Sequence, residues 1–293
     1  MTTGDVMKAV RTVLCATLVV AALALPRSAW AQQRPLVTED PAVIGGGQVL
    51  VQGGFDWLHS QPYPVSGLKG NLIAVPTLGI FVGLSSIAEL EFYGAPYQRL
   101  AITSRQSAPL SNLLTAQGDT TSDVQDLVVG TKVRILSETS GRPALGIRFA
   151  TKLPNASNES GLGLNTTDFL GTLLIGKTIE SVRVVGNIGG GILGDPTVGY
   201  RQNDVILYGV SFARAITAQI DMVGEINGRA NTRAKGALPG TDSQSELRFG
   251  GRYTRGPMRL DAGVLFGMTS QDPSIGLTAG VTYVFNAFKL PQP

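Results

Sequence analysis

Apolar and polar residues alternate along most of the chain in runs of about ten residues, the pattern of strands with one apolar face. In residues 143–153, Leu145 and Ile147 point to one face, whereas Arg148 and Lys152 point to the other. The apolar face of this run carries no charged residue. The pattern predicts about twelve strands, at residues 47–58, 70–82, 87–98, 124–136, 143–153, 168–177, 182–193, 204–213, 217–229, 245–254, 258–268 and 275–285.

The connections between these strands are alternately short and long. Residues 83–86, 137–142, 178–181, 214–216 and 255–257 form the short ones, and residues 59–69, 99–123, 154–167, 194–203, 230–244 and 269–274 form the long ones. Short turns at one rim and long loops at the other are typical of outer-membrane barrels, whose short turns are periplasmic. We therefore predict an all-β fold, an antiparallel up-and-down transmembrane β-barrel over residues 47–285, with short periplasmic turns and longer extracellular loops. Residues 32–46 would form a periplasmic N-terminal segment and residues 286–293 a C-terminal tail.

The start of the chain has the features of an export signal. Lys8 and Arg11 give it a positive beginning, residues 12–25 are apolar, and small residues lead up to Ala31. An apolar stretch of this length is too short to span a bilayer as a helix. We expect a signal peptide over residues 1–31, cleaved after Ala31, and a mature protein in the outer membrane.

Composition excludes several classes of function. The only cysteine, Cys15, falls in the expected signal peptide, and His59 is the only histidine. The mature chain therefore offers no cysteine or histidine cluster for a metal. Most of the formal charge of +3 comes from the signal, so charge gives no reason to expect a nucleic-acid partner. The glycines at 189–191 lack the lysine-serine pair of a phosphate loop, and we expect neither a cofactor nor a metal.

Two other folds compete with the membrane barrel. Residues 70–88 run without a charge, as in a spanning helix, but Pro76 and several glycines interrupt them. A soluble secreted β-sandwich or barrel would turn its apolar faces inward, and periodicity does not say which face is inside. Glycines on the apolar faces, such as Gly186 and Gly190, would leave gaps in a dense soluble core, which favours the membrane barrel.

Several short motifs resemble those of an outer-membrane family. Residues 34–40 (RPLVTED) resemble the segment before the first strand in the family described as putative meta-pathway of phenol degradation proteins, which usually has Asp where this chain has Glu39. Residues 152–154 (KLP), 163–168 (GLNTTD) and 203–204 (ND) are similar to its motifs at strand ends. The resemblance covers about residues 34–285. It implies a barrel that passes aromatic or other small compounds, and it brings no catalytic residue.

An enzyme is one alternative function. A lipid hydrolase of the outer-membrane phospholipase type needs a serine and an orienting polar partner beside a histidine. His59 is expected at the start of a long loop, where its neighbour Ser60 points elsewhere, and Ser270 and Ser274 lie at loop ends. A solvated loop histidine explains this pattern better, and we expect no enzyme. A barrel that binds ligands through its surface loops is another alternative.

Many charged residues face the inside of the predicted barrel by parity. The expected channel-lining residues are Glu89, Glu91, Lys132, Arg134, Arg148, Lys152, Arg183, Asp221, Glu225, Arg248, Arg252, Arg259 and Asp261. In one interpretation they form cross-strand ion pairs that tie the wall together. In the other, unpaired arginines such as Arg183 and Arg248 line a narrow path for polar or weakly acidic solutes. Inward glycines leave room beside them, and a barrel of about twelve strands is narrow, so we expect a constricted lumen.

The longest predicted loop, residues 99–123, is unusually apolar. It contains Leu110, Leu113 and Leu114 but few charges. Because exposed apolar surface tends to find a partner, we expect this loop to fold over the extracellular mouth, or else to dock against lipopolysaccharide or a neighbouring barrel.

The predicted function is an outer-membrane channel or diffusion-type transporter for small molecules, with aromatic or hydrophobic compounds as candidate solutes. Selectivity would come from pore width and lining charge. The expected partners are outer-membrane lipid, lipopolysaccharide, the barrel assembly machinery and the small-molecule solute.

Overall fold

The computed structural model describes residues 34–289. The predicted signal peptide, its cleavage after Ala31 and the last residues of the C-terminal tail lie outside this range. Within it, the chain forms strands and one 3₁₀ helix, Ser111–Leu113. No helix in residues 34–289 is long and apolar enough to cross a membrane. The predicted all-β class is confirmed.

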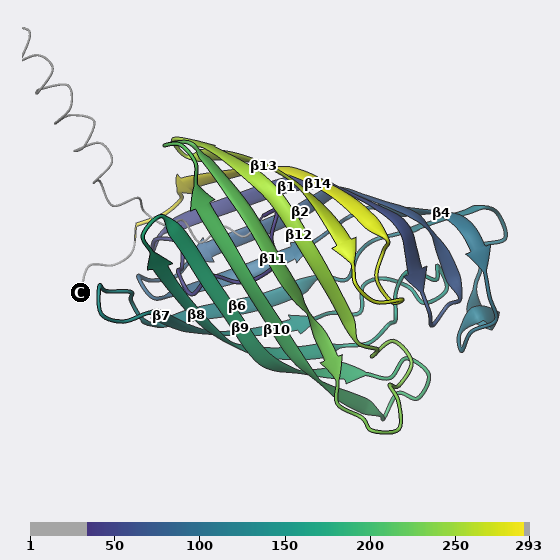
Figure 1. Cartoon of the computed structure of the whole chain (residues 1–293). Coiled ribbons are helices and arrows are strands. Elements are labelled where there is room, and N and C mark those ends of the chain that lie inside the picture. The colour runs from purple at the N-terminus through teal and green to yellow at the C-terminus, as the bar shows by residue number, and fades with distance from the viewer. Residues whose placement is uncertain (1–33, 290–293) are drawn as a thin grey trace, which may run out of the picture. The chain divides into compact units, whose positions relative to one another are not determined.

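The strands close into an antiparallel barrel (Figure 1). They are β1 Gln48–Tyr63, β2 Leu68–Gly83, β3 Ala88–Gly94, β4 Gln98–Arg105, β5 Thr120–Asp123, β6 Val128–Leu136, β7 Ala144–Lys152, β8 Asp168–Ile179, β9 Val182–Gly194, β10 Gln202–Ala215, β11 Ile220–Asn231, β12 Gln244–Arg255, β13 Met258–Gly267 and β14 Ile275–Asn286. From β6 onward each strand pairs with the next along the chain, and β14 pairs with β1 to close the ring. The predicted up-and-down topology is confirmed.

Two of the wall strands are each made of two pieces. β3 and β4 follow one another along β2, and β5 and β6 follow one another beside them. The 14 strands of the sheet less these two continuations give the twelve wall strands that the sequence predicts. The prediction that residues 99–123 form one long loop is wrong. β1 and β2 extend beyond their predicted ends, and the extended β2 supplies hydrogen-bonding partners for β4.

The wall is apolar outside and charged inside. On the outer face, Ile188, Phe149 and Met222 expose 61%, 57% and 56% of their surface. On the inner face, Lys132 and Glu89 are completely buried. A soluble barrel would show the reverse arrangement, whereas a barrel in lipid needs an apolar outer band. The soluble alternative is therefore excluded by the direction in which the side chains point.

The connections divide between the two ends of the barrel. The long-loop rim consists of residues 64–67, 106–119, 153–167, 195–201, 232–243 and 268–274, and the short-turn rim of residues 84–87, 137–143, 180–181, 216–219 and 256–257. Antiparallel strands place alternate connections at the same end, and most of the longer links lie at one rim, as predicted. Two links depart from the predicted alternation: residues 64–67 are short because β1 and β2 extend beyond their predicted ends, and residues 137–143 are as long as residues 195–201.

The apolar outer face generates a stability prediction. Ile188→Arg, in the middle of β9, should lower the free energy of unfolding by about 2–4 kcal/mol, because a guanidinium is costly in the centre of a bilayer. Ile188→Leu keeps the surface apolar and should change it by no more than about 0.5 kcal/mol. Denaturant unfolding in lipid vesicles measures both variants, and equal stabilities would contradict a lipid-facing surface.

Candidate functional site: the lumen and its inner segment

Residues 34–44, which precede β1, lie inside the barrel, and we refer to them as the inner segment. At its start, the Arg34 guanidinium donates a hydrogen bond to the Thr278 hydroxyl of β14 at 2.7 Å. At its end, the Ile44 N–H donates to the Glu89 carboxylate of β3 at 2.6 Å. The sequence predicts a periplasmic segment here and does not anticipate this position. The wall supplies hydrogen bonds that a segment without secondary structure cannot make for itself.

The wall also holds the middle of the inner segment through its backbone. The Glu225 carboxylate of β11 accepts the N–H groups of Val37 at 2.8 Å and Thr38 at 2.7 Å. The Asn187 carboxamide of β9 accepts from the Glu39 N–H at 2.7 Å and donates to the Glu39 carbonyl at 2.8 Å. These side chains take the place of a neighbouring strand.

Glycines of the wall make room for the inner segment. A Cβ atom on Gly54 of β1 would lie 2.4 Å from the Arg34 guanidinium, and one on Gly280 of β14 would lie 2.5 Å from it. A Cβ atom on Gly250 of β12 would lie 2.7 Å from Pro35. The room that these inward glycines were expected to leave beside the charged side chains is therefore partly filled by the chain itself, which adds to the predicted constriction of the lumen.

A buried charge cluster forms where the inner segment meets β3, β6 and β7. It consists of Glu39, Glu89, Glu91, Lys132 and Arg148. Lys132 Nζ lies 2.8 Å from Glu89, 3.3 Å from Glu39 and 3.6 Å from Glu91. Arg148 Nε lies 2.7 Å from Glu91 and 3.1 Å from Glu39. Three carboxylates thus share two cations. Burial, and next the charge of Glu91, raise the pKa of Glu39 to about 7.

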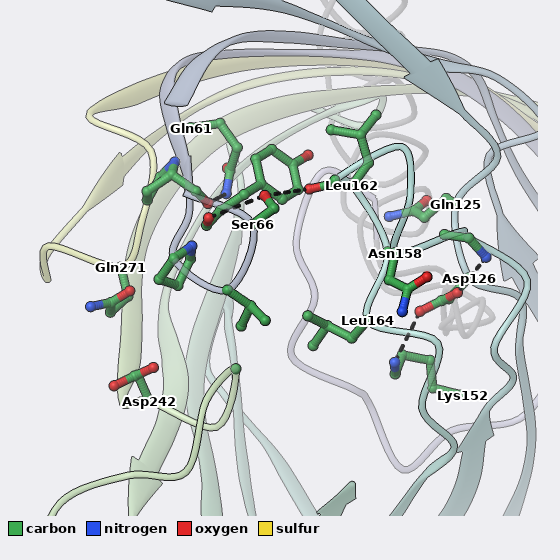
Figure 2. A pocket seen from close by; sticks show the side chains of 18 of the residues that line it. Gln61, Ser66, Gln125, Asp126, Lys152, Asn158, Leu162, Leu164, Asp242 and Gln271 are labelled. Atoms are coloured by element: carbon green, nitrogen blue, oxygen red, sulfur yellow. Dashed lines mark hydrogen bonds and ion pairs between the residues drawn. The ribbon is translucent and has the colours of Figure 1, made fainter. Parts of the chain in front are cut away.

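A mouth cavity of about 400 Å³ opens at the long-loop rim (Figure 2). Its lining combines apolar side chains, such as Leu58 and Leu162, with the carboxamides of Gln125, Asn158 and Gln271. Figure 2 shows Gln125 and Asn158 on one side of this cavity and Gln271 on the other. The cavity therefore offers apolar surface together with separate hydrogen-bonding groups.

The apolar segment between β4 and β5 folds over this mouth, which is one of the two positions that its composition leaves open. The Leu110 N–H donates to the Val65 carbonyl at 2.9 Å, and the Leu110 side chain lines the cavity. Leu114 packs against a core cluster of Leu68, Leu72, Leu100 and Leu162. The segment is thus fixed at the mouth by both backbone and side-chain contacts.

An inner cavity of about 380 Å³ lies next to the mouth cavity. Arg229 and Gln244 border both spaces. The inner segment contributes Val37, Thr38 and Glu39 to the lining of the inner cavity. The Arg229 guanidinium donates to two backbone carbonyls of the loop before β12, which fixes it at the junction.

Most of the predicted channel-lining residues contact the inner segment or one another. Those that hydrogen-bond or pair with the segment are Glu89, Lys132, Arg148, Arg183, Glu225, Arg252 and Asp261. The others interact within the wall: Glu91 with Lys132, Arg134 with the Ser86 carbonyl, Lys152 with Asp126, Arg248 with Glu246, Arg259 with Thr254, and Asp221 opposite Arg252. Three of them border a cavity: Lys152 the mouth cavity, and Arg148 and Arg248 the inner cavity.

The hypothesis that Arg183 and Arg248 are unpaired is wrong. Arg183 pairs with Asp40 at 2.8 Å and Arg248 with Glu246 at 2.6 Å. Neither the ion pair of Arg183 with the inner segment nor the place of Arg229 at the junction of the cavities is predicted from the sequence. The only available signal was the resemblance at residues 34–40, which marked the segment without indicating that it lies inside.

His59 differs from its predicted place. It lies within β1, which continues to Tyr63, because β1 pairs with β14 up to this residue. The His59 ring is exposed and stacks on Trp57, with 5.9 Å between ring centroids. Within residues 34–289, its ring makes no hydrogen bond to a serine hydroxyl or a carboxylate.

The apolar outer wall, the two rims and the partly filled lumen define a β-barrel of the outer-membrane class. The chain belongs to the family described as "Putative MetA-pathway of phenol degradation", whose sequence profile matches residues 35–285. The family resemblance noted from the sequence is confirmed.

Solved structures share this fold. The COG4313 outer membrane channel from Pseudomonas putida F1 is similar with a TM-score of 0.62 and 14% identity, over 84% of this chain and 98% of that one. The NanC porin matches with a TM-score of 0.48 and 9% identity over 80% and 98% of the two chains. A mutant of the TodX monoaromatic hydrocarbon channel matches with a TM-score of 0.41 and 13% identity over 84% and 93%. A search of curated proteins found no match. The first similarity establishes the fold.

The charge cluster generates a second stability prediction. Lys132→Met removes a cation shared by three carboxylates, and the free energy of unfolding should fall by about 3–5 kcal/mol. Lys69→Met is the matched control, because Lys69 is exposed on β2 and its ammonium has no carboxylate within ion-pair distance among residues 34–289, so the substitution should change the free energy of unfolding by no more than about 0.5 kcal/mol. Denaturant unfolding in detergent micelles measures both. A loss for Lys132→Met no larger than that of the control would contradict the role of the cluster.

Proposed function

We propose that this protein is a passive outer-membrane channel for small molecules and that the inner segment is its gate. The observation that carries the proposal is the succession of two cavities inside a closed wall, with Arg229 and Gln244 bordering both. A solute that moves from the mouth cavity into the inner cavity meets residues 37–39 of the inner segment. Passage through the lumen then depends on whether this segment stays in place.

The mouth cavity favours a small, mostly apolar solute with a hydrogen-bonding group. Leu58 and Leu162 offer apolar contact, and Gln125 and Asn158 offer amide donors and acceptors. Pockets of several hundred Å³ with apolar walls and a few polar groups are typical of small-molecule sites. Aromatic compounds have this character, and the description of the family, which names phenol degradation, supports them as solutes.

The inner segment is suited to act as a gate because no strand ladder includes it. Segments outside a ladder open at a lower free energy than the strands around them. Its contacts differ in kind: ion pairs hold Arg34 and Glu39 at either side, whereas Val37 and Thr38 between them are held through their N–H groups by Glu225 alone. We infer that residues 35–38 move when these two hydrogen bonds to Glu225 break and that Glu39 remains anchored.

Three of the predicted channel-lining residues are proposed to meet the solute, namely Lys152 in the mouth cavity and Arg148 and Arg248 in the inner cavity. All three already have carboxylate partners. An apolar or neutral compound can approach a paired charge at a lower desolvation cost than a free charge, because an ion pair has less hydration to lose. The remaining predicted residues support the wall and the inner segment.

Passive transport accounts for the chain better than catalysis does. A hydrolase would need a serine and an orienting group around His59. The His59 ring instead lies on the outer face and stacks on Trp57. Such a ring pair is similar to the aromatic residues that membrane proteins place at membrane interfaces. This supports a protein without enzymatic activity.

The outer membrane is the location that fits these features. We infer that lipid covers the apolar outer face and that the long-loop rim faces outward, where lipopolysaccharide is the expected neighbour. β14 ends in aromatic and apolar residues up to Phe285, which supports recognition by the barrel assembly machinery. Export would depend on the predicted signal peptide over residues 1–31.

A reversible crosslink tests the gate. A Cβ atom on Gly209 would lie 2.8 Å from Thr38 Oγ1, which suits a disulfide, and Cys15 in the predicted signal is the only natural cysteine. We expect the oxidised double variant Thr38→Cys/Gly209→Cys to conduct ions less well than its reduced form in planar bilayers, because the segment can no longer move. Thr38→Cys alone is the control and should not respond to oxidation. Equal currents from the oxidised and reduced double variant would contradict gating by the inner segment.

A further inference from the structure

Two cations lie on the outer face of the barrel near the long-loop rim, and we refer to them as the rim cations. They are Lys69 of β2 and Arg99 of β4, and both are exposed. Arg99 lies opposite Ile73 of β2, which exposes 39% of its surface on the outer face. Lys69 shares the parity of Ile73 along β2, so both cations point away from the lumen. Figure 1 shows β4 at the end of the barrel that carries the long loops.

The rim cations have no acidic partner. Within residues 34–289, no carboxylate lies within ion-pair distance of either side chain. The acidic residue of the adjacent strand, Asp123 of β5, is turned the other way, because it lies opposite the buried Gln98. Its carboxylate accepts hydrogen bonds from the Ser157 N–H at 2.8 Å and the Ser160 hydroxyl at 2.5 Å. The two positive charges are therefore not neutralised by the described part of the chain.

The other wall strands carry no such cations at this rim. In β6 to β14, the outer positions nearest the long-loop rim hold one charged residue, Asp204 of β10, which lies opposite the exposed Ile192. Lys152 and Arg229 are close to the same rim but face the mouth cavity. The rim cations thus form a local positive patch on β2 and β4.

An aromatic residue indicates the level of the rim cations in the membrane. Outer-membrane barrels carry aromatic side chains where the apolar band meets the lipid head groups. Trp57 of β1 lies opposite Ile73, and Ile73 lies opposite Arg99, so Trp57 and Arg99 belong to one cross-strand row. Lys69 lies closer to the long-loop rim than Ile73, by about 13 Å at about 3.3 Å per residue. Arg99 is therefore at the expected edge of the hydrocarbon, and Lys69 is among the head groups.

Phosphate is the chemical group that suits this patch. Arginine binds phosphate through two parallel hydrogen bonds, and lysine binds it as a compact charge. Basic clusters beside a bilayer attract anionic lipid head groups. Lipopolysaccharide, the expected neighbour of the long-loop rim, carries several phosphates on its sugars and can pair with both cations at once, which favours it over a lipid with one phosphate. The hydroxyls of Thr120 and Ser122, on the same outer face of β5, offer hydrogen bonds to the sugars.

We propose that Lys69 and Arg99 form a binding site for the phosphates of lipopolysaccharide, which holds one molecule of this lipid against β2, β4 and β5. The inference rests on the proposed outer-membrane location with the long-loop rim outward, and it adds a lipid site outside the transport path. β5 pairs with β4 alone, so a lipid bound across these strands braces the part of the wall that has the fewest strand neighbours.

A binding assay in detergent micelles tests the site. Trp57 is the only tryptophan of residues 34–289, and its place in the row of Arg99 makes its fluorescence a reporter for lipid bound there. The purified protein is titrated with intact lipopolysaccharide, with the same lipid after chemical removal of its phosphates, and with inorganic phosphate. The test variant is Lys69→Gln/Arg99→Gln. The matched control is Arg233→Gln/Lys235→Gln, which removes two exposed cations from a loop of the same rim. Heat-modifiable migration on gels verifies that each variant is folded.

We expect the unaltered protein and the control variant to bind intact lipopolysaccharide equally. Lys69→Gln/Arg99→Gln should bind it about 30-fold more weakly, since each basic residue near an anionic surface contributes about five-fold. Lys69→Arg/Arg99→Lys keeps both charges and should retain most of the affinity. Removal of the phosphates from the lipid should reduce its affinity for the unaltered protein to that of the test variant.

Three results would overturn the site. They are equal affinity of the folded test variant and the unaltered protein for the intact lipid, equal affinity of the unaltered protein for the intact and the dephosphorylated lipid, and no saturable change with either lipid. Displacement of the lipid by inorganic phosphate at equal concentration would overturn lipopolysaccharide as the occupant. Ion currents in planar bilayers are a separate measurement: phosphate-dependent lipid binding by a protein that carries no current would support the site and contradict the proposed transport.

Discussion

Charged side chains that face the inside of a narrow barrel need partners, and in this protein the inner segment is one of them. Lys132 and Arg148 point inward from β6 and β7, and Glu39 lies within ion-pair distance of both. At the other end of the segment, Arg34 pairs with the completely buried side chain of Asp261. Without the segment, these wall charges would lose a partner, which is costly for a buried ion. The same residues therefore stabilise the wall and obstruct the lumen.

In this arrangement, the width of the barrel and the width of the open path through it are set by different parts of the chain. The strand number sets a narrow barrel, and the inner segment then occupies part of its width. What remains open are the mouth cavity and the inner cavity, joined beside Arg229. In the proposed gating, a compound that binds in the mouth cavity has not yet crossed the charged lumen, and one that goes further has to move the segment. Selection among solutes would then depend first on the surface of the mouth cavity.

The wall could be predicted from the sequence because successive side chains of a strand point to opposite faces, so that apolar and polar residues alternate. In β7, Leu145 belongs to the apolar face and Arg148 to the polar one. The inner segment could not, because it forms no ladder and has no period. Its contacts are also remote along the chain, as between Arg34 and Asp261. The split strands escaped prediction for a related reason: the backbone is interrupted at residues 95–97 although the apolar alternation continues on either side. Parity identified which charges face inward but not which partner each of them has.

The position of the inner segment is the central claim, and amide hydrogen exchange measures it most directly. Residues 35–45 lie outside all strands, so their N–H groups would exchange quickly if the segment were in water. The hydrogen bonds to Glu225, Asn187 and Glu89 predict instead that Val37, Thr38, Glu39 and Ile44 exchange much more slowly than the loop at residues 232–243, in the folded protein in detergent micelles. Exchange of these four amides as fast as that of the loop would contradict a segment held inside the barrel.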